Sequence, residues 1–372
     1  MIRLLHVLDA GADEYRLLTL RTLLERLPAD EFSQQVASID ARAARRAADV
    51  LGRPVLRAER RCHVSLSCGP RLRSIGREHR ADILHVWGPD ALSSCAAAAE
   101  GRRLVVSGIH LGEMDRAVRW LRQIAPAPAV IASGQVARAR LAQLGVRSDH
   151  LAVIRTAVDF AAISAARQSG IRESLVGPAG PVVLLAGSVR RGDGSFEAMW
   201  ACAMLQRLLA DIRVVMPYGG DEADRLARLA EASHTPRVPV MPGGRYRWTE
   251  LVAAADVMVV APAGESDTEP IAWAMAAGLP VIGVARRSIA ELIADHSNGL
   301  LCRTNAPRGL AAALLRLHED AGLRRQLAEV ARGQAYEVFS VRGFIDNYLA
   351  AYRNVLAGRA IGDGVSDMAM VA

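Results

Sequence analysis

Short apolar runs alternate with amphipathic stretches along most of the chain. In the first half, each apolar run has the length of one buried strand, and stretches such as 14–27 repeat apolar residues at helical spacing. We expect strands at 2–8, 32–39, 81–86, 104–109, 130–133 and 153–154, and helices at 14–27, 113–124 and 135–144. This alternation predicts a parallel sheet with helices on both faces.

The second half repeats the pattern after a linker at 161–179 that is rich in Ala, Ser and Gly. We expect strands at 182–186, 213–216, 238–241, 257–260 and 281–284, with helices between them. The sequence therefore predicts an α/β protein with two doubly wound, Rossmann-like domains in tandem. The expected parts are a first domain at 1–165, a second domain at 166–341, a helix at 342–357 and a flexible tail at 358–372.

Composition agrees with a globular protein of about two domains, since 51% of the 372 residues are hydrophobic and 23% are charged. The formal net charge is +7. The chain contains no Lys, so all of its Lys and Arg positions are occupied by Arg. This charge suits a nucleotide, an anionic lipid or a nucleic acid as partner. The five Cys residues do not form a zinc pattern, so we expect buried thiols in a reducing cytosol. No apolar segment is long enough to span a bilayer, and the N-terminus reads as a strand rather than a signal peptide.

The most informative stretch runs from Val257 to Leu301. An apolar strand is followed by a loop that contains Glu265, a helix of small residues at 270–277, and a Gly-Leu-Pro stop before the next strand. Ligands of such β-loop-α-β units sit beyond the carboxyl ends of the strands, where this loop lies.

The same stretch resembles the nucleotide-sugar site of retaining glycosyltransferases of family 4, which have the GT-B fold. Glu265 matches the first acidic residue of that family's pair, and the run from Ala274 to Val281 matches the segment after the second. The second acidic position is Trp273, and Glu269 lies one helical turn before it. The resemblance implies two domains that face a cleft. It also implies transfer of a sugar from a nucleotide-activated donor to a glycan or lipid-linked acceptor, with retention.

Other family motifs occur in order. Gly11 stands in a loop that resembles the family's glycine loop near the donor phosphates. The strand ending in His110 resembles a strand whose His lies on the acceptor side. The turn at Val158-Asp159 and the helix after Ser340 resemble the segments that leave and rejoin the first domain.

The family's phosphate-binding loop is altered. Gly187 and Gly194 keep their places, but the Arg and Lys positions are Ser188 and Asp193. An Asp repels a diphosphate. Arg190 and Arg191 lie in the same loop and are the candidates to replace the lost charge, because a guanidinium binds phosphate through two hydrogen bonds.

Thus the candidate catalytic residues are His110 and Glu265. The candidate donor-binding residues are Gly11, Gly187, Arg190, Arg191, Glu265, Glu269 and Trp273. We expect no metal, because the chain has no Asp-x-Asp triplet and Cys62, His63 and Cys68 lack further ligands. The arginines and a helix N-terminus then have to neutralise the leaving diphosphate.

Several alternatives remain open at this stage. His110 can be an ordinary strand-end residue, Arg190 and Arg191 solvated loop residues, and Glu269 a helix-dipole residue. The protein can also be a GT-B-like binding or scaffold protein without catalysis, in a polysaccharide assembly pathway, or a sugar-nucleotide epimerase.

Charge patterning adds one more alternative. The helix expected at 113–124 carries Arg116, Arg119 and Arg122 beside Trp120, which fits either an ordinary surface helix or peripheral contact with an anionic membrane. We expect a cytoplasmic protein, with any lipid contact at the inner membrane face. Nucleic acid is not expected as a partner, because the Arg-rich region 41–80 has no recognition helix.

Overall fold

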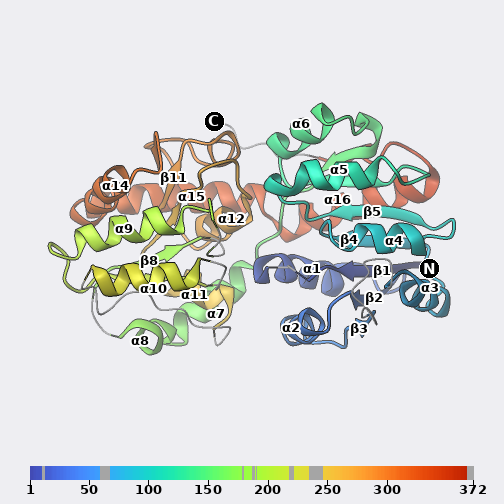
Figure 1. Cartoon of the computed structure of the whole chain (residues 1–372), viewed down its shortest axis with the longest axis horizontal. Coiled ribbons are helices and arrows are strands. Elements are labelled where there is room, and N and C mark those ends of the chain that lie inside the picture. Colours follow the sequence, from blue (N-terminus) through green and yellow to red (C-terminus); the bar gives the residue numbers. More distant parts are fainter. Residues whose placement is uncertain are drawn as a thin grey trace. The chain divides into compact units, whose positions relative to one another are not determined.

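The computed structural model describes residues 1–10, 13–58, 68–177, 180–186, 189, 191–217, 222–233 and 246–366. The chain forms two compact units (Figure 1). Unit 1 comprises Met1–Ala157 together with Val341–Asp367, and unit 2 comprises Val158–Ser340.

The described part of unit 1 is built on a seven-stranded parallel sheet with the strand order β3-β2-β1-β4-β5-β6-β7. Its strands are β1 (Ile2–Leu8), β2 (Phe32–Ser38), β3 (Leu56–Arg57), β4 (Ile83–Trp87), β5 (Arg103–Ser107), β6 (Ala129–Ala132) and β7 (Leu151–Val153). Its helices are α1 (Glu14–Arg26), α2 (Ala41–Leu51), α3 (Gly69–Glu78), α4 (Leu92–Ala98), α5 (Met114–Leu121), α6 (Gln135–Gln143) and α16 (Val341–Ala357), with short 3-10 turns η2 (Leu111–Glu113) and η3 (Ser148–His150).

Both faces of this sheet are buried, which explains why its strands read as nearly continuous apolar runs. In β1, Leu5 and Val7 pack with residues of α3, α4, α5 and α6, whereas Leu4 and Leu8 pack with residues of α1, α2 and α16. The period of two along the strand therefore assigns alternate side chains to two separate cores.

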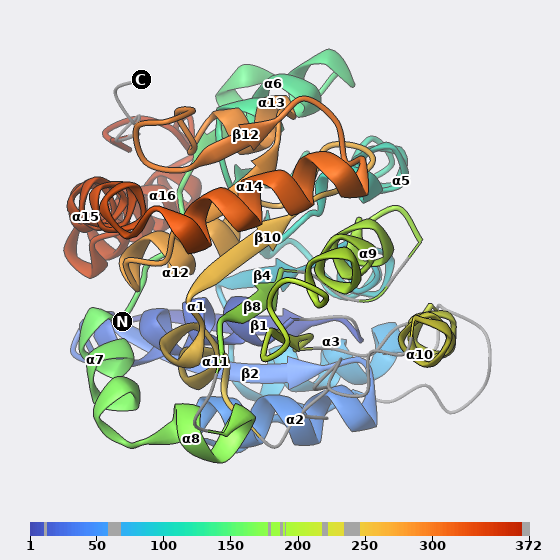
Figure 2. The ribbon, with the colours of Figure 1, turned by 90° about the vertical axis from the view of Figure 1, so that its left-hand side faces the viewer.

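The described part of unit 2 contains a five-stranded parallel sheet with the order β12-β11-β10-β8-β9. Its strands are β8 (Val182–Leu185), β9 (Arg213–Val215), β10 (Val257–Val260), β11 (Val281–Val284) and β12 (Leu300–Cys302). Its helices are α7 (Phe160–Gln168), α8 (Ile171–Val176), α9 (Ser195–Leu205), α10 (Ala223–Ala232), α11 (Trp248–Ala254), α12 (Glu269–Ala276), α13 (Arg287–Ala290), α14 (Pro307–Glu319) and α15 (Ala321–Val338). In Figure 2, which looks onto this unit, α14 crosses in front of β10. Leu314 of α14 and Leu205 of α9 share the core over the sheet.

These two parallel sheets with helices confirm the predicted α/β class, but several local predictions were wrong. The expected linker at 161–179 folds largely as α7 and α8, and Asp159 caps α7 by accepting a hydrogen bond from the Ala162 N–H at 2.9 Å. Residues 41–51 form α2 and Leu300–Cys302 form β12, and neither element was predicted. The strand expected at 238–241 lies outside the described residues.

The tail expected to be flexible from 358 onward is ordered over 358–366. Ile361 is buried and donates its N–H to the Asp149 carbonyl at 3.0 Å. The Asn354 amide donates to the carbonyls of Ile361 and Asp363, at 3.4 and 2.7 Å. The small, polar composition of this segment did not reveal its apolar contacts: Ile361 is buried, and the partly buried Val365 packs against the same core. Residues 367–372 lie outside the described part.

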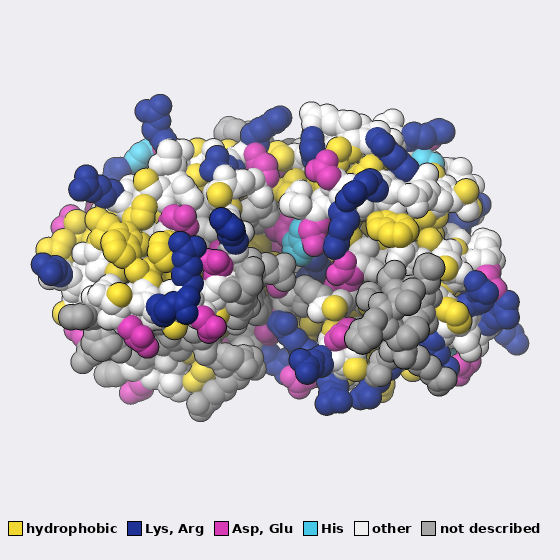
Figure 3. All heavy atoms as spheres, in the orientation of Figure 1, with side chains coloured by type: hydrophobic (Ala, Val, Ile, Leu, Met, Phe, Trp, Pro, Cys, Tyr) yellow, Lys and Arg dark blue, Asp and Glu magenta, His cyan; other side chains and the backbone are white. Residues whose placement is uncertain are grey.

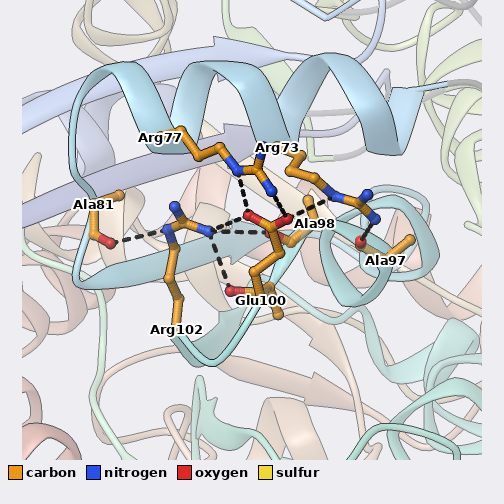
Figure 4. A network of polar contacts seen from close by, with 8 residues as sticks. Arg73, Arg77, Ala81, Ala97, Ala98, Glu100 and Arg102 are labelled. Carbon is orange, nitrogen blue, oxygen red and sulfur yellow. Dashed lines mark hydrogen bonds and ion pairs between the residues drawn. The ribbon is translucent and has the colours of Figure 1, made fainter.

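A surface network fastens α3 and α4 to the turn before β5 (Figure 4). The Glu100 carboxylate accepts hydrogen bonds from Arg77 and Arg102 and lies 3.3 Å from Arg73 Nε. Hydrogen bonding from Arg77 holds the pKa of Glu100 below its usual value. Because the network lies at the surface, it fixes geometry more than it adds stability.

Candidate functional site

His110 lies just beyond the carboxyl end of β5, at the N-terminal side of η2. Its ring faces two side chains from the start of α1. Arg16 places Nη1 3.0 Å from His110 Nε2 and Nη2 3.3 Å from Nδ1. Asp13 Oδ2 lies 3.9 Å from His110 Nε2 and accepts the Tyr15 hydroxyl at 2.7 Å. The sheet order places β1 and β5 on either side of β4, so their following loops meet at one edge.

The Arg16 contact constrains the state of His110. A guanidinium has donors only, and a neutral imidazole has one acceptor nitrogen, so one of these two contacts is a hydrogen bond and the other is a close approach only. An imidazolium has no acceptor, so this arrangement fits the neutral ring. Gly108 makes the contact possible, because a Cβ there would lie 3.1 Å from Arg16 Cδ and the residue has φ of +67°.

Sequence reasoning missed Arg16, although a signal was available. Arg16, Leu20 and Leu23 share one face of α1 at helical spacing, and both leucines are buried. A charged residue in such an apolar stripe is unusual. Arg16 is itself 2% exposed, so it is a part of the site rather than a surface residue.

In unit 2, Glu265 lies in the loop between β10 and α12. Its two carboxylate oxygens accept the backbone N–H groups of Ser288, at 2.8 Å, and Arg287, at 3.2 Å, at the start of α13. Burial pushes the pKa of Glu265 upward, but the hydrogen bonds from Ser288 and the N–H and charge of Arg287 outweigh it and hold the pKa below its usual value. Glu265 is therefore ionised at neutral pH and oriented by α13.

The loop between β8 and α9 is pinned to the loop that carries Glu265. The Ala263 N–H donates to the Gly192 carbonyl at 2.8 Å. Asp193, which stands at the family's Lys position, caps α9 by accepting the Ser195 N–H at 3.0 Å. The N-terminus of α9, where a diphosphate would be expected to bind, is thus occupied in part by a carboxylate of the chain itself.

Gly194 is essential to this pinning. It has φ of +82°, and a Cβ would lie 1.7 Å from the Ala261 carbonyl oxygen. We expect Gly194→Ala to destabilise unit 2 by about 3 kcal/mol or more, since a backbone clash adds to the left-handed strain. Gly192→Ala is the matched control, because Gly192 has φ of +90° but no atom within 4 Å of where an added Cβ would lie. It should cost only about 1 kcal/mol of strain. Urea denaturation of both variants measures the difference, and equal costs would contradict the pinning.

Arg191 is exposed at a cavity of about 240 Å³ between the β8–α9 loop and α10. The same cavity is lined by Arg225, which lies 4.3 Å over the Phe196 ring and pairs with Glu222 at 2.7 Å. Three predicted donor-binding residues, Gly11, Gly187 and Arg190, lie outside the described residues.

The other two donor-binding candidates lie on α12. Glu269 is the first residue of the helix and is partly buried, a position that suits the helix dipole. Trp273 is 2% exposed, and its indole N–H has no hydrogen-bond partner in the described part of the chain. The ring thus offers no face for stacking on a base or sugar, and the expectation that Trp273 binds the donor is not supported. The cause is that α12 is buried along nearly its whole length between the sheet, α11 and α15.

Within the described ranges, no group of three or more His, Cys, Asp or Glu residues could hold a metal ion. Cys62 and His63 lie outside these ranges. Among the described helices, none has the length and apolar character needed to cross a bilayer.

The helix considered for lipid contact is α5. Met114, Val118 and Leu121 are buried as expected, and Trp120 is 40% exposed. Arg116 pairs with Asp90 and Glu113, and Arg122 donates to the Leu144 carbonyl. On the face drawn in Figure 3, arginines of both units are interspersed with carboxylates. The basis for lipid contact is therefore reduced to Arg119 and Trp120.

Two family models match successive parts of the chain. Residues 19–162 match Glycosyltransferase Family 4, and residues 170–334 match Glycosyl transferases group 1. The chain belongs to the GT-B glycosyltransferases of the family 4 type. These matches cover the segments that carry His110 and Glu265.

Individual relatives are more distant. The chain is 29% identical over 146 residues to N-acetyl-alpha-D-glucosaminyl L-malate synthase of Bacillus anthracis. This match covers 39% of this chain and 38% of that protein. It is 30% identical over 223 residues to D-inositol 3-phosphate glycosyltransferase of Xylanimonas cellulosilytica, and this match covers 56% of this chain and 53% of that protein. The chain thus spans about half or less of the length of these curated relatives.

A solved structure shares the fold over nearly the whole chain. Anabaena HepE, determined in complex with UDP and glucose, matches with a TM-score of 0.77 and 19% identity, over 95% of this chain and 100% of that one. At this identity the likeness shows the GT-B fold alone.

Proposed function

We propose that this GT-B family member transfers a sugar from a nucleotide-activated donor to an acceptor hydroxyl, with retention of the anomeric configuration. The observation that carries the proposal is Glu265, which is ionised and held by α13 at the carboxyl edge of the unit 2 sheet. The family matches on both halves and the UDP complexes of the similar structure support a nucleotide-sugar donor, with UDP as the first nucleotide to test.

In this reaction the bond between the anomeric carbon and the diphosphate breaks, a bond to the acceptor oxygen forms, and the proton of the acceptor hydroxyl passes to the departing diphosphate. Arg190 and Arg191 neutralise the leaving diphosphate, and no metal takes part. Glu265 stabilises the positive charge that develops on the sugar, and its fixed orientation avoids the cost of reorganising it. His110, held by Arg16, lies on the acceptor side.

The acceptor is a glycan or a lipid-linked glycan in this proposal. The exposed Arg119 and Trp120 support peripheral contact with anionic lipid. The names of the two curated relatives point to small acceptors, malate and inositol phosphate, and these should be tested alongside.

A second candidate is a GT-B-like binding or scaffold protein without catalysis. Two observations favour it: Asp193 caps α9 where a diphosphate would bind, and Trp273 is buried where the family has an acidic residue.

Release of the nucleoside diphosphate separates the two candidates. With UDP-, GDP- and ADP-sugars and a panel of acceptors, we expect the wild type to release diphosphate equally with and without a chelator. Glu265→Gln should lower the turnover about 10²-fold with little change in donor affinity, since the amide can still accept one α13 hydrogen bond but lacks the charge. No release from any donor, or equal release by Glu265→Gln, would contradict the proposed role of Glu265.

A further inference from the structure

A second cavity lies in unit 1, at the end of the sheet opposite His110. It has a volume of about 180 Å³ and is lined by Arg103, His150 and Arg359 among others. Arg103 is the first residue of β5, whereas His110 lies three residues beyond Ser107, the last residue of the same strand. The cavity is therefore not a part of the candidate acceptor site.

The ordered C-terminal segment closes one side of this cavity. Residues Gly358 to Ile361 line it, and Ile361 is anchored by its N–H bond to the Asp149 carbonyl. The segment is held further along by Asn347, whose amide donates to the Ser366 carbonyl at 2.8 Å and whose oxygen accepts the Ser366 N–H at 2.9 Å. These contacts hold residues 358–366 in place, so the segment forms a fixed wall of the cavity.

The cavity carries a net positive charge. Neither Arg103 nor Arg359 forms an ion pair within the described part of the chain. Asp149 is the one carboxylate among the described lining residues, and Arg147 pairs with it at 2.5 Å. Two arginines therefore line the cavity without forming an ion pair with a carboxylate in the described part of the chain.

His150 supplies a third nitrogen. Its Nδ1 lies 3.2 Å from the Pro128 carbonyl, and because a carbonyl can only accept, Nδ1 carries a proton. This bond fixes the ring. In the neutral ring Nε2 is then an acceptor, so it can contact a phosphate only through a P–OH hydrogen.

We propose that this cavity binds a small phosphate-type anion, either inorganic phosphate or the phosphate of a phosphomonoester. Arginine forks bind such oxyanions through paired, charge-assisted hydrogen bonds. The cavity is smaller than the roughly 300–1,000 Å³ of pockets for drug-sized ligands, which favours a small anion over a complete nucleotide sugar. The proposal does not depend on the transfer reaction proposed above.

The test is calorimetry of the full chain with inorganic phosphate and with glycerol 3-phosphate, each against sodium chloride of equal ionic strength. We expect the double variant Arg103→Gln/Arg359→Gln to bind at least tenfold more weakly, because each charge-assisted bond contributes about a tenfold factor or more. Arg42→Gln/Arg45→Gln is the matched control; both arginines are exposed on α2 and the change in net charge is the same. Arg190→Gln/Arg191→Gln separates this site from the donor site and should leave the binding unchanged.

Hydrogen exchange at the Ile361 amide gives an independent readout, since a bound anion should slow its exchange in the wild type and not in the Arg103/Arg359 variant. Binding of glycerol 3-phosphate alone would identify the ligand class as a phosphomonoester. Binding of both anions would show that the cavity recognises the phosphate group that they share. The proposal is overturned if neither anion binds more tightly than chloride, or if the Arg103/Arg359 variant binds as well as the wild type.

Discussion

Unit 1 should lose stability steeply as the pH falls from about 6.5 to about 4. His6 and His85 are fully buried on adjacent strands, with ring centroids 5.3 Å apart. Burial lowers the pKa of His6 from 6.5 to about 4, opposed by its hydrogen bond to Gln34 and assisted by the charge of Arg53. Burial, with His6 as a second cause, lowers the pKa of His85 well below 6.5.

The hydrogen bonds agree with neutral rings. The Trp87 indole N–H donates to His6 Nδ1 at 3.2 Å, so this nitrogen cannot carry a proton. His85 is held between the Tyr352 hydroxyl at 2.7 Å and the Ser107 hydroxyl at 2.8 Å. Protonation of either ring puts a charge into the core against α16.

The sign and size follow from linkage. Below pH 6.5 the unfolded chain binds a proton at His6, whereas the folded chain does so only near pH 4, so protons favour unfolding within this window. With about 1.4 kcal/mol for each pKa unit, the difference between 6.5 and about 4 makes His6 alone worth about 3 kcal/mol. The contribution is fully present above pH 6.5 and lost as the pH falls to about 4, and His85 adds to it.

Native-state hydrogen exchange of β1 and β4 amides, measured between pH 7 and 4.5, checks this effect in unit 1. The carboxylates with lowered pKa values, such as Glu31 and Glu100, titrate below this pH range in the folded protein, so their titration is separate from that of His6. His6→Asn should flatten the pH dependence, because its side chain can accept and donate without titrating. His318→Asn, at an exposed site on α14, is the control. If the stability of unit 1 fell equally with pH in His6→Asn and in the wild type, His6 would be ruled out as a cause of the pH dependence.

Replacing both Arg190 and Arg191 by Gln should weaken nucleotide-sugar binding by at least tenfold. Ser188 and Asp193 cannot supply positive charge, and Asp193 instead caps α9. A charge-assisted hydrogen bond contributes roughly 1.5–3 kcal/mol, and about 1.4 kcal/mol corresponds to a factor of ten. Arg207→Gln/Arg228→Gln removes the same charge from exposed positions in unit 2 and should leave the affinity almost unchanged. Equal losses in the two double variants would mean that only long-range charge matters.

Much of the fold could be predicted because the strands are buried on both faces. Runs such as 2–8 and 257–260 need no partner information to be recognised, and β1 and β10 begin and end at these residues. Elements without such a run were missed. Residues 41–51 are dominated by Ala and Arg, and only packing of Ala44, Ala47, Val50 and Leu51 against the core shows that they form α2.

In the candidate site, the sequence indicated only those residues whose position follows from the end of a predicted strand. His110 and Glu265 follow strands, so the sequence indicated their edge of each sheet. The burial of Trp273 and the contact between Arg16 and His110 depend on side-chain packing across elements far apart in sequence. The capping roles of Glu265 and Asp193 depend on loop geometry, which spacing along the chain does not reveal.

Calorimetry of the wild-type chain with a matched set of UDP-, GDP- and ADP-sugars tests the central claim most directly. The proposed glycosyltransferase should bind at least one of them, and that affinity should fall by about tenfold or more in the Arg190/Arg191 double variant. If the wild type binds none of them while Asp193→Lys restores binding, the donor site is inactive in this chain, and the scaffold function replaces the enzyme.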